Sequence, residues 1–266
     1  PTVRDREQTV TLADAKGRVE FRDVSFAYPD AEEKTLDDIS FTAEPGKTTA
    51  IIGGTGCGKS TLISLIPRFY DVTEGSITLD GIDVRDMKQH DLRENIGYVP
   101  QKGLLFSGTI GTNLQYGRED ATLAEMTDAA ETAQAMEFIS EKENGFDEEV
   151  SQGGTNVSGG QKQRLSIARA LVKKPKVYIF DDSFSALDFR TDKALREALS
   201  EKVGDSTIII VAQRINTIID ADQIIVLEEG RIAGRGTHEE LLANCSVYKE
   251  IALSQLSEKE LERGRA

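Results

Sequence analysis

Residues 53–61 read Gly53-Gly54-Thr55-Gly56-Cys57-Gly58-Lys59-Ser60-Thr61, directly after the apolar run Ala50-Ile51-Ile52. The segment that follows, from Thr61 to Ile66, is expected to be a helix. A G-x-x-x-x-G-K-[ST] loop between a strand and a helix is the pattern that binds nucleotide phosphates. Its glycines let backbone N–H groups surround phosphate oxygens at the start of a helix, where the partial positive charge favours an anion. The stretch therefore predicts a phosphate-binding loop.

Several side chains are expected to act at this loop. Lys59 would reach the β and γ phosphates, and the hydroxyl of Ser60 would ligate Mg²⁺. Asp181 ends the apolar run 177–181, a predicted buried strand, and a carboxylate there is the expected second Mg²⁺ partner. Cys57 fills a small-residue position. A reactive thiol is the alternative interpretation, because a helix N-terminus can lower a thiol pKa.

A second glycine motif, Ser158-Gly159-Gly160-Gln161, opens the helix predicted over residues 162–172. The simpler interpretation is a capping box, with Ser158 at the N-cap and Gln161 at N3. The adjacent glycines also expose backbone donors and permit the close approach of a phosphate. One nucleotide would then have two phosphate sites in the chain. A dimer accounts for both, if each nucleotide lies between the loop of one chain and this motif of the other.

The remaining patterns alternate between strands and helices. The runs 208–211 and 224–227 are typical of buried strands in a parallel sheet. Residues 19–26 have the pattern of a half-buried strand, and residues 75–84 that of a hairpin. Residues 109–145 are rich in Ala, Glu and Met at helical spacing. This order predicts an α/β core with a parallel sheet.

The amino-acid composition excludes several kinds of function. The 266 residues include 32 Lys and Arg against 46 Asp and Glu, a net charge of −14 that argues against a nucleic-acid partner. No apolar run approaches the ~18 residues of a membrane helix, and no signal peptide is recognised. With two cysteines, Cys57 and Cys245, and two histidines, neither a disulfide scaffold nor a zinc site is expected. His90 is given no role, and His238 is expected on the surface.

Taken together, the motifs resemble those of the nucleotide-binding domain of an ABC transporter of the exporter type, over about residues 18–253. The resemblance implies ATP and Mg²⁺ as cofactors. It also implies a P-loop NTPase (RecA-like) core with a parallel sheet, an N-terminal antiparallel β subdomain and an inserted α-helical subdomain at about 104–172. Residues 1–17 would be a linker or arm from a membrane domain, and residues 254–266 a charged C-terminal tail.

The resemblance assigns roles to further residues. Tyr28 would stack on adenine, Gln101 would lie near Mg²⁺ and the attacking water, and residues 104–110 would face the coupling helices of a membrane domain. The expected ATP contacts are Tyr28, Gly53, Gly54, Thr55, Gly56, Cys57, Gly58, Lys59, Ser60, Thr61, Gln101, the signature motif (Ser158, Gly159, Gly160, Gln161) and Asp188 of the D-loop. The expected catalytic residues are Asp182, Gln213, Gln101 and Lys59, and the expected metal ligands are Ser60, Gln101 and Asp181.

Two positions depart from the family pattern. The residue after the strand 177–181 is normally a Glu that acts as general base, and here it is Asp182, shorter by about 1 to 1.5 Å. A misplacement of about 1 Å can cost ~10²-fold in rate. The switch-loop residue is normally His, and here it is Gln213, which cannot carry positive charge toward the γ-phosphate. We therefore expect tight MgATP binding and slow hydrolysis at this chain's own site.

Both departures lie on the phosphate-loop side, while the signature side is nearly unchanged. This is similar to one subunit of a heterodimeric bacterial multidrug exporter, at the cytoplasmic face of the cell membrane. The partner would be a second nucleotide-binding domain with an intact Glu and His, whose competent site this chain's signature motif completes. Two alternatives stay open: a regulatory nucleotide-binding subunit without significant hydrolysis, and an active homodimeric ABC ATPase. A soluble ABC ATPase of DNA repair or translation is disfavoured.

Overall fold

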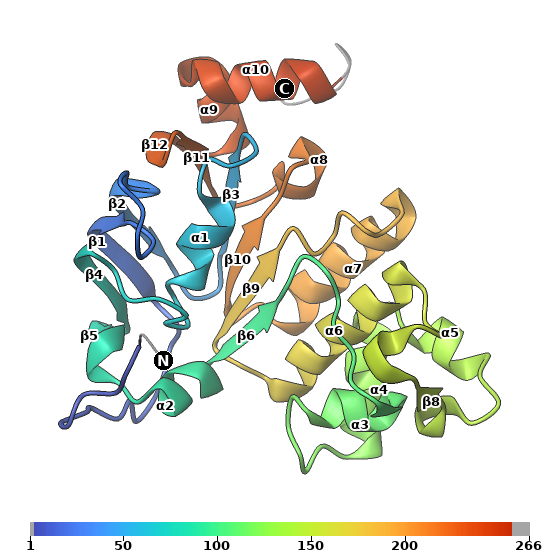
Figure 1. The fold of residues 1–266 in the computed structure, drawn as a ribbon. Helices are drawn as coiled ribbons and strands as arrows, with labels where there is room; N and C mark the ends of the chain where they lie inside the picture. The colour runs from blue at the N-terminus through green and yellow to red at the C-terminus, as the bar shows by residue number, and fades with distance from the viewer. Residues whose placement is uncertain (1–2, 257–266) are drawn as a thin grey trace.

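The structure, a computed structural model, describes residues 3–256 of the chain. It contains a six-stranded sheet in the order β12-β11-β3-β10-β9-β6, a four-stranded sheet in the order β2-β1-β4-β5, and a small β7-β8 pair. Figure 1 shows the four-stranded sheet on one side of the larger sheet and a group of helices on the other. The strands are β1 Val19–Phe26, β2 Leu36–Ala43, β3 Thr48–Gly53, β4 Glu74–Leu79, β5 Ile82–Asp83, β6 Ile96–Val99, β7 Gly108–Thr109, β8 Glu149–Val150, β9 Val177–Asp181, β10 Thr207–Val211, β11 Gln223–Glu228 and β12 Arg231–Gly236.

The larger sheet is parallel except for its edge strand β12, which pairs antiparallel with β11. The smaller sheet is antiparallel throughout. The predicted fold class is confirmed: a parallel-sheet core with an antiparallel β subdomain and helices. The predicted strands at 19–26, 177–181, 208–211 and 224–227 all form.

Each central strand of the larger sheet supplies two cores. In β3, Ala50 and Ile52 pack with the helices of one face, whereas Ile51 packs with the antiparallel sheet on the other face. In β9, Phe180 and Ile179 divide in the same way. Side chains alternate along a strand, so burial on both faces needs apolar residues at every position. That requirement explains why these strands appear as continuous apolar runs.

Helices cover both faces of the larger sheet, and most lie on the side away from the antiparallel sheet (Figure 1). The α-helices are α1 Lys59–Ser64, α2 Gln89–Glu94, α3 Ile110–Gln115, α4 Leu123–Thr132, α5 Met136–Ser140, α6 Gly159–Lys173, α7 Phe189–Lys202, α8 Ile215–Ile218, α9 His238–Asn244 and α10 Ser246–Gln255, with 3₁₀ turns η1 Val84–Asp86, η2 Gly145–Asp147 and η3 Gln152–Gly154. The helix expected over 61–66 is α1, and it begins two residues earlier. The helix expected over 162–172 is α6, and it begins at Gly159.

Residues 3–17 lie against the antiparallel side of the molecule. Val3 and Ala15 are buried, and the backbone N–H of Val10 donates to the carbonyl of Asp86 at 2.7 Å. The Asp80 carboxylate accepts the backbone N–H groups of residues 16–18. The expected tail at 254–266 begins in the last turn of α10, and its residues 257–266 lie outside the described part of the chain.

The expectation that His238 lies on the surface was wrong. Its residue surface is only 4% exposed, because α10 packs over α9 and the hydroxyl of Tyr248 lies 2.7 Å from the His238 ring nitrogen Nδ1. Burial lowers the pKa of the imidazole. His238 is therefore a core residue that joins the two C-terminal helices.

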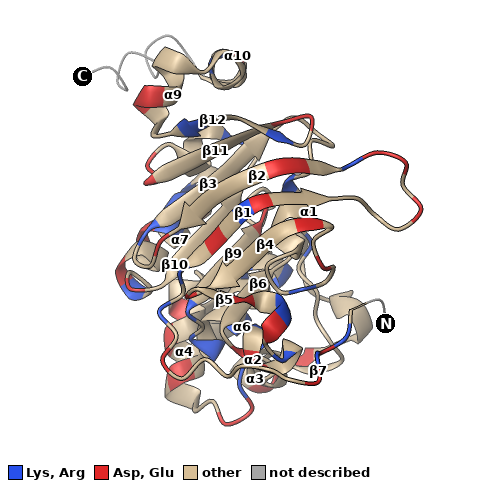
Figure 2. Ribbon diagram, turned by 90° about the vertical axis from the view of Figure 1, so that its left-hand side faces the viewer, with Lys and Arg blue, Asp and Glu red and all other residues tan. Residues whose placement is uncertain are grey.

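Charged residues of both signs are interspersed on the face drawn in Figure 2, where the loop 27–35 extends beyond the antiparallel sheet. None of the helices in the described range 3–256 combines the length and apolar character needed to cross a bilayer. Within the same range, no group of three or more His, Cys, Asp or Glu side chains is arranged to hold a metal ion.

Candidate nucleotide-binding site

The phosphate loop follows β3 and runs into α1. Gly53 must be glycine, because a Cβ there would lie 2.2 Å from the carbonyl oxygen of Leu227 on β11. Gly58 caps α1 in the left-handed conformation, with φ 101°. Gly54 and Gly56 face open space. The neighbouring strand β11 and the start of α1 thus fix the two ends of the loop. The middle of the loop is left free for a ligand to approach the backbone.

The Lys59 ammonium lies inside this loop. Its Nζ donates to the carbonyl oxygens of Gly53 and Gly54, each at 2.8 Å, and lies 3.8 Å from the sulfur of Cys57. Cys57 is buried, and a Cβ on Gly53 would lie 2.6 Å from its sulfur. The thiol therefore fills a tightly packed position beneath the loop, in agreement with the small-residue interpretation.

Ser60 and Asp181 meet at the end of β9. The Ser60 hydroxyl donates to Asp181 Oδ1 at 2.9 Å, and the Tyr98 hydroxyl donates to Oδ2 of the same carboxylate at 3.3 Å. Burial raises the pKa of the Asp181 carboxyl, against the lowering effect of these hydrogen bonds. A hydroxyl and a carboxylate are the oxygen ligands that Mg²⁺ takes from a protein when substrate phosphates and water supply the rest. The pair fits such an ion.

Asp182 stands at the centre of a second hydrogen-bonded group. Its Oδ2 accepts from the side-chain Nε2 of Gln101 at 3.1 Å and from that of Gln213 at 3.0 Å. Its backbone is left-handed, with φ 48°, and its N–H donates to the carbonyl of Val211 at 2.9 Å. Asp182 is only 7% exposed, and burial raises the pKa of its carboxyl group. The structure thus brings together three of the residues expected to be catalytic.

Tyr28, which follows β1 of the antiparallel sheet, lies beside the phosphate loop. Its hydroxyl is 2.8 Å from that of Thr61 on α1, and its ring meets the rings of Phe26 and Tyr70 edge to face, at centroid distances of 4.9 and 5.2 Å. The residue is 36% exposed. An aromatic face near the loop is therefore accessible to a planar ligand.

The signature motif opens α6, far from the loop in the sequence. The predicted capping box is confirmed: the Ser158 hydroxyl accepts from the Gln161 N–H, and the Gln161 side chain accepts from the Ser158 N–H. Gly159 faces open space, and a Cβ on Gly160 would lie 3.5 Å from the Ala186 carbonyl of the D-loop. Asp188 caps α7 by accepting from the Thr191 N–H at 3.0 Å. Within residues 3–256, no hydrogen bond joins residues 158–161 to residues 53–61.

Two residues of the site were not identified from the sequence. Tyr98 holds the Asp181 carboxylate, and Tyr70 supports the ring of Tyr28. Tyr98 sits in the strand β6, which lies beside β9 in the sheet, with Tyr98 opposite Ile179. Strand order reveals this proximity, and the sequence carries no signal for it.

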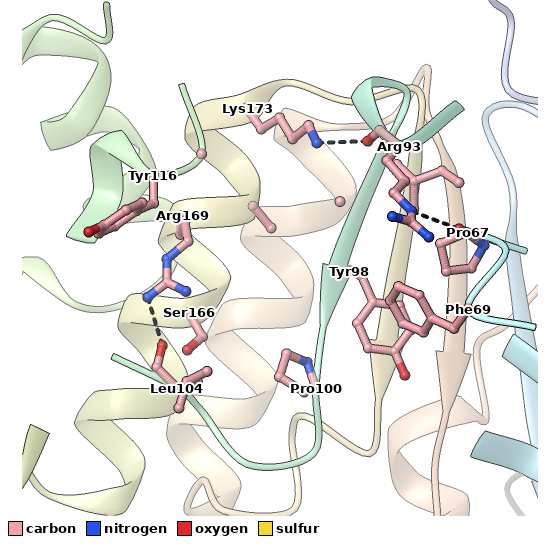
Figure 3. A pocket seen from close by; sticks show the side chains of 14 residues that line it. Pro67, Phe69, Arg93, Tyr98, Pro100, Leu104, Tyr116, Ser166, Arg169 and Lys173 are labelled. Atoms are coloured by element: carbon pink, nitrogen blue, oxygen red, sulfur yellow. Dashed lines mark hydrogen bonds between the residues drawn. The ribbon is translucent and has the colours of Figure 1, made fainter. Parts of the chain in front are cut away.

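A groove lies behind the site, between β6 and α6. Figure 3 shows Phe69 and Tyr98 on one side of it and Ser166 and Arg169 on the other. Arg169 donates to the carbonyl of Leu104 at 2.7 Å, and the Ser166 hydroxyl is buried without a hydrogen-bond partner. The groove is thus lined by aromatic and basic side chains, and the hydroxyl of Ser166 in its wall is buried.

The surface formed by the loop before β7 and the end of α3, at the side of the groove, is also apolar. Leu104, Phe106 and Tyr116 are 55%, 42% and 63% exposed, and the Phe106 and Tyr116 rings lie 4.7 Å apart. The Arg169 guanidinium lies 5.4 Å from the Phe106 ring centroid. An exposed aromatic surface of this kind is typical of a protein contact.

Comparison with known proteins identifies the family. Residues 36–185 match the family model described as ABC transporter. The chain is 51% identical over 242 residues to an uncharacterized ABC transporter ATP-binding protein of Mycobacterium tuberculosis, covering 90% of this chain and 41% of that protein. It is 45% identical over 263 residues to the β-(1→2)glucan export ATP-binding/permease protein NdvA of Rhodopseudomonas palustris, covering 99% of this chain and 43% of that protein.

A solved structure agrees over nearly the whole chain. It is described as a bacterial Atm1-family ABC exporter with ATP bound, and it matches with a TM-score of 0.92 and 40% identity, over 97% of this chain and 45% of that one. The chain therefore spans about two fifths of the length of the curated relatives it matches. It belongs to the ABC transporter family and is an ATP-binding domain of the exporter type.

Proposed function

We propose that this chain is the MgATP-binding motor domain of an ABC exporter and that its own phosphate-loop site hydrolyses ATP slowly. ATP phosphates would bind residues 53–61, with Lys59 on the β and γ phosphates. Ser60, Asp181 and Gln101 would hold Mg²⁺, and Tyr28 would stack on adenine. The open middle of the loop and the 2.9 Å contact between Ser60 and Asp181 support this assignment.

The observation that carries the slow site is the hydrogen bonding of Asp182. Its Oδ2 accepts from Gln101 and Gln213, so one of the two carboxylate oxygens that could take a proton from water is held by two neutral amides. A Glu at this position would reach about 1 to 1.5 Å further, and displacements of that size matter to catalysis. Gln213 can donate a hydrogen bond to a γ-phosphate but adds no charge to it.

The signature motif would act on a nucleotide bound to another chain. Gly159 faces open space, and residues 158–161 make no hydrogen bond with this chain's own loop among the described residues. We therefore propose that MgATP joins two such domains, with Asp188 of the D-loop at their interface. The partner would be a different chain that carries the Glu and His absent here, and Ser158 to Gln161 would complete its competent site.

The groove between β6 and α6, together with residues 104–110, would receive the coupling helices of a membrane domain. Its exposed aromatic side chains support this contact. Relatives of more than twice this length are named as export ATP-binding/permease proteins, which supports an exporter and a site of action at the cytoplasmic face of the cell membrane. Opening and closing of the two ATP-binding domains would then move the membrane segments.

A purely regulatory subunit and an active homodimer make different predictions for one experiment. Single-turnover hydrolysis is followed with the chain in excess over ATP, alone and with a partner domain whose own phosphate loop is disabled by a Lys→Ala change. We expect tight binding in both cases, slow cleavage with the partner domain, and almost none by the chain alone. No cleavage at all would favour a regulatory subunit, and fast cleavage by the chain alone would favour an active homodimer.

A further inference from the structure

Gln255, the last residue of α10, contacts the loop that holds Gln213. Its Oε1 accepts from the backbone N–H of Ile215 at 2.8 Å, and its Nε2 donates to the backbone carbonyl of Gln213 at 2.7 Å. One side-chain amide therefore brackets three consecutive residues, as the backbone of a neighbouring strand would. The sequence places Gln255 in the expected charged tail, where no role was foreseen.

The side chain of Gln255 caps the N-terminus of α8, which has no capping side chain of its own. α8 begins after Arg214, whose side chain makes no capping hydrogen bond. The first N–H groups of a helix have no acceptor within the helix and need one from elsewhere. Gln255 supplies that acceptor to Ile215, which is fully buried. The backbone just after Gln213 is thus ordered by a residue of the C-terminal helix.

α10 itself is held firmly. Ala252 and Leu256, which flank Gln255, are buried in the same core as Ile215. One turn further back, the hydroxyl of Tyr248 is 2.7 Å from the ring of His238 on α9. Gln255 is exposed, but the helix that carries it is packed on both sides of the side chain. Gln255 is therefore held in place by its helix and can in turn hold the loop at residues 213–215.

Gln213 connects Gln255 to the nucleotide site. Its side-chain Nε2 donates to Asp182 Oδ2, which also accepts from Gln101. A continuous series of hydrogen bonds thus runs from Gln255 through the backbone and side chain of Gln213 to Asp182 and Gln101. A change at Gln255 would reach the site through the position of Gln213.

We propose that Gln255 is a positioning residue: it fixes the backbone at 213–215 so that the Gln213 side chain meets the γ-phosphate of bound ATP. This inference rests on the proposed function, in which Gln213 faces that phosphate. ADP lacks the γ-phosphate, so the two hydrogen bonds of Gln255 should favour the binding of ATP over that of ADP. If Gln255 had a merely structural role, its loss would weaken the binding of both nucleotides alike.

The test measures the dissociation constants of AMP-PNP and ADP, both with Mg²⁺, by calorimetry on the 266-residue chain. Gln255→Ala should lower the preference for AMP-PNP over ADP by about threefold to tenfold, the effect of losing one aligned hydrogen bond, and leave ADP affinity unchanged. Ser254→Ala is the matched control, because among residues 3–256 its hydroxyl bonds only to the Ile251 carbonyl within α10. It should leave the preference unchanged.

Gln213→Ala and the double variant show where the effect arises. If Gln255 acts through Gln213, the double variant should match Gln213→Ala alone. A preference that falls in Gln213→Ala and not in Gln255→Ala would overturn the positioning role and leave the proposed function intact. A preference unchanged in Gln213→Ala would contradict the γ-phosphate contact itself, and the positioning role with it.

Hydrogen exchange gives a second readout without nucleotide. In Gln255→Ala the amides of residues 215–218 should exchange faster, while those of β9 and β10 keep their protection and show that the fold is intact. Gln255→Glu retains an acceptor for Ile215 and loses the donor to Gln213, so it should restore the protection of Ile215. Unchanged exchange of Ile215 in Gln255→Ala would overturn the bracket.

Discussion

The side chain of Gln213 donates to the carboxylate of Asp182 at 3.0 Å, so the two positions that depart from the family pattern are in direct contact. The sheet brings them together. β9 and β10 are parallel neighbours with Asp181 opposite Val211, and the Asp182 N–H donates to the Val211 carbonyl. Asp182 lies one residue beyond the end of β9 and Gln213 two residues beyond the end of β10, so both lie at the same edge of the sheet. Because they touch, their effects should not be additive.

Asp182→Glu and Gln213→His should together raise hydrolysis at this site by about 10²-fold, because the base gains reach and the switch residue can carry charge. Either change alone should give much less. The measurement is ATPase activity with a partner domain that supplies its signature motif and whose own phosphate loop is disabled. Ser254→Ala in the same background is the control. No gain from the double change would contradict our explanation of the slow site.

Lys59→Ala should weaken ATP binding by about tenfold to a hundredfold, since charged hydrogen bonds to phosphate are lost from the loop. Its ammonium now bonds to the carbonyls of Gly53 and Gly54, so it is already aimed into the loop. The matched control is Lys47→Ala, an exposed lysine before β3. Calorimetry measures both affinities, and an unchanged value in Lys59→Ala would refute the phosphate-loop assignment.

Tyr28→Ala should weaken ATP binding, because stacking of a base on an aromatic ring contributes about 1–3 kcal/mol. Tyr28→Phe keeps the ring and loses only the hydroxyl contact with Thr61, so its affinity should stay within about threefold of the original. Fluorescence titration with a labelled ATP analogue compares the two. Equal losses in both variants would mean that the hydroxyl, and not the ring, is what matters.

Much of the fold could be predicted because its central strands are buried on both faces and therefore apolar throughout. The loop 53–60 and the pair Ser60 and Asp181 could be predicted as well, since each residue type answers to a known chemical requirement. Contacts that depend on strand order could not. Tyr98 reaches Asp181 because β6 lies beside β9, and no local pattern reports that neighbour.

The C-terminal end was the least predictable part. His238 follows a polar helix start, and only the packing of α10 over α9 buries it. Gln255 lies in a polar stretch where one exposed glutamine is indistinguishable from the next by sequence. The contacts of the Gln255 side chain depend on which backbone segment lies opposite, and only the tertiary structure determines that.

The buried His238 predicts a pH dependence of stability. Burial lowers its pKa in the folded chain below the ordinary value of 6.5, so the unfolded chain takes up the proton first. Stability should be fully present above pH 6.5 and decrease as the pH falls from there toward the lower folded pKa. The slope from this one group is at most about 1.4 kcal/mol per pH unit.

Urea unfolding between pH 7.5 and about 5 checks this dependence. His238→Asn should flatten the decrease. His90→Asn should not, because the His90 side chain is 79% exposed. Equal slopes for His238→Asn and the unchanged chain would show that the ring titrates alike in the folded and unfolded states.

The central claim is that this chain binds ATP tightly and hydrolyses it slowly at its own site. The most direct measurement is steady-state ATPase of the purified chain, alone and mixed with a candidate partner domain, with ATP binding followed in parallel. We predict tight binding and almost no hydrolysis by the chain alone. Activity should appear on mixing, be lost with Ser158→Ala in this chain, and be largely retained with Lys59→Ala. Substantial hydrolysis by the chain alone, rising cooperatively with its concentration, would contradict the account and identify an ordinary homodimeric ATPase.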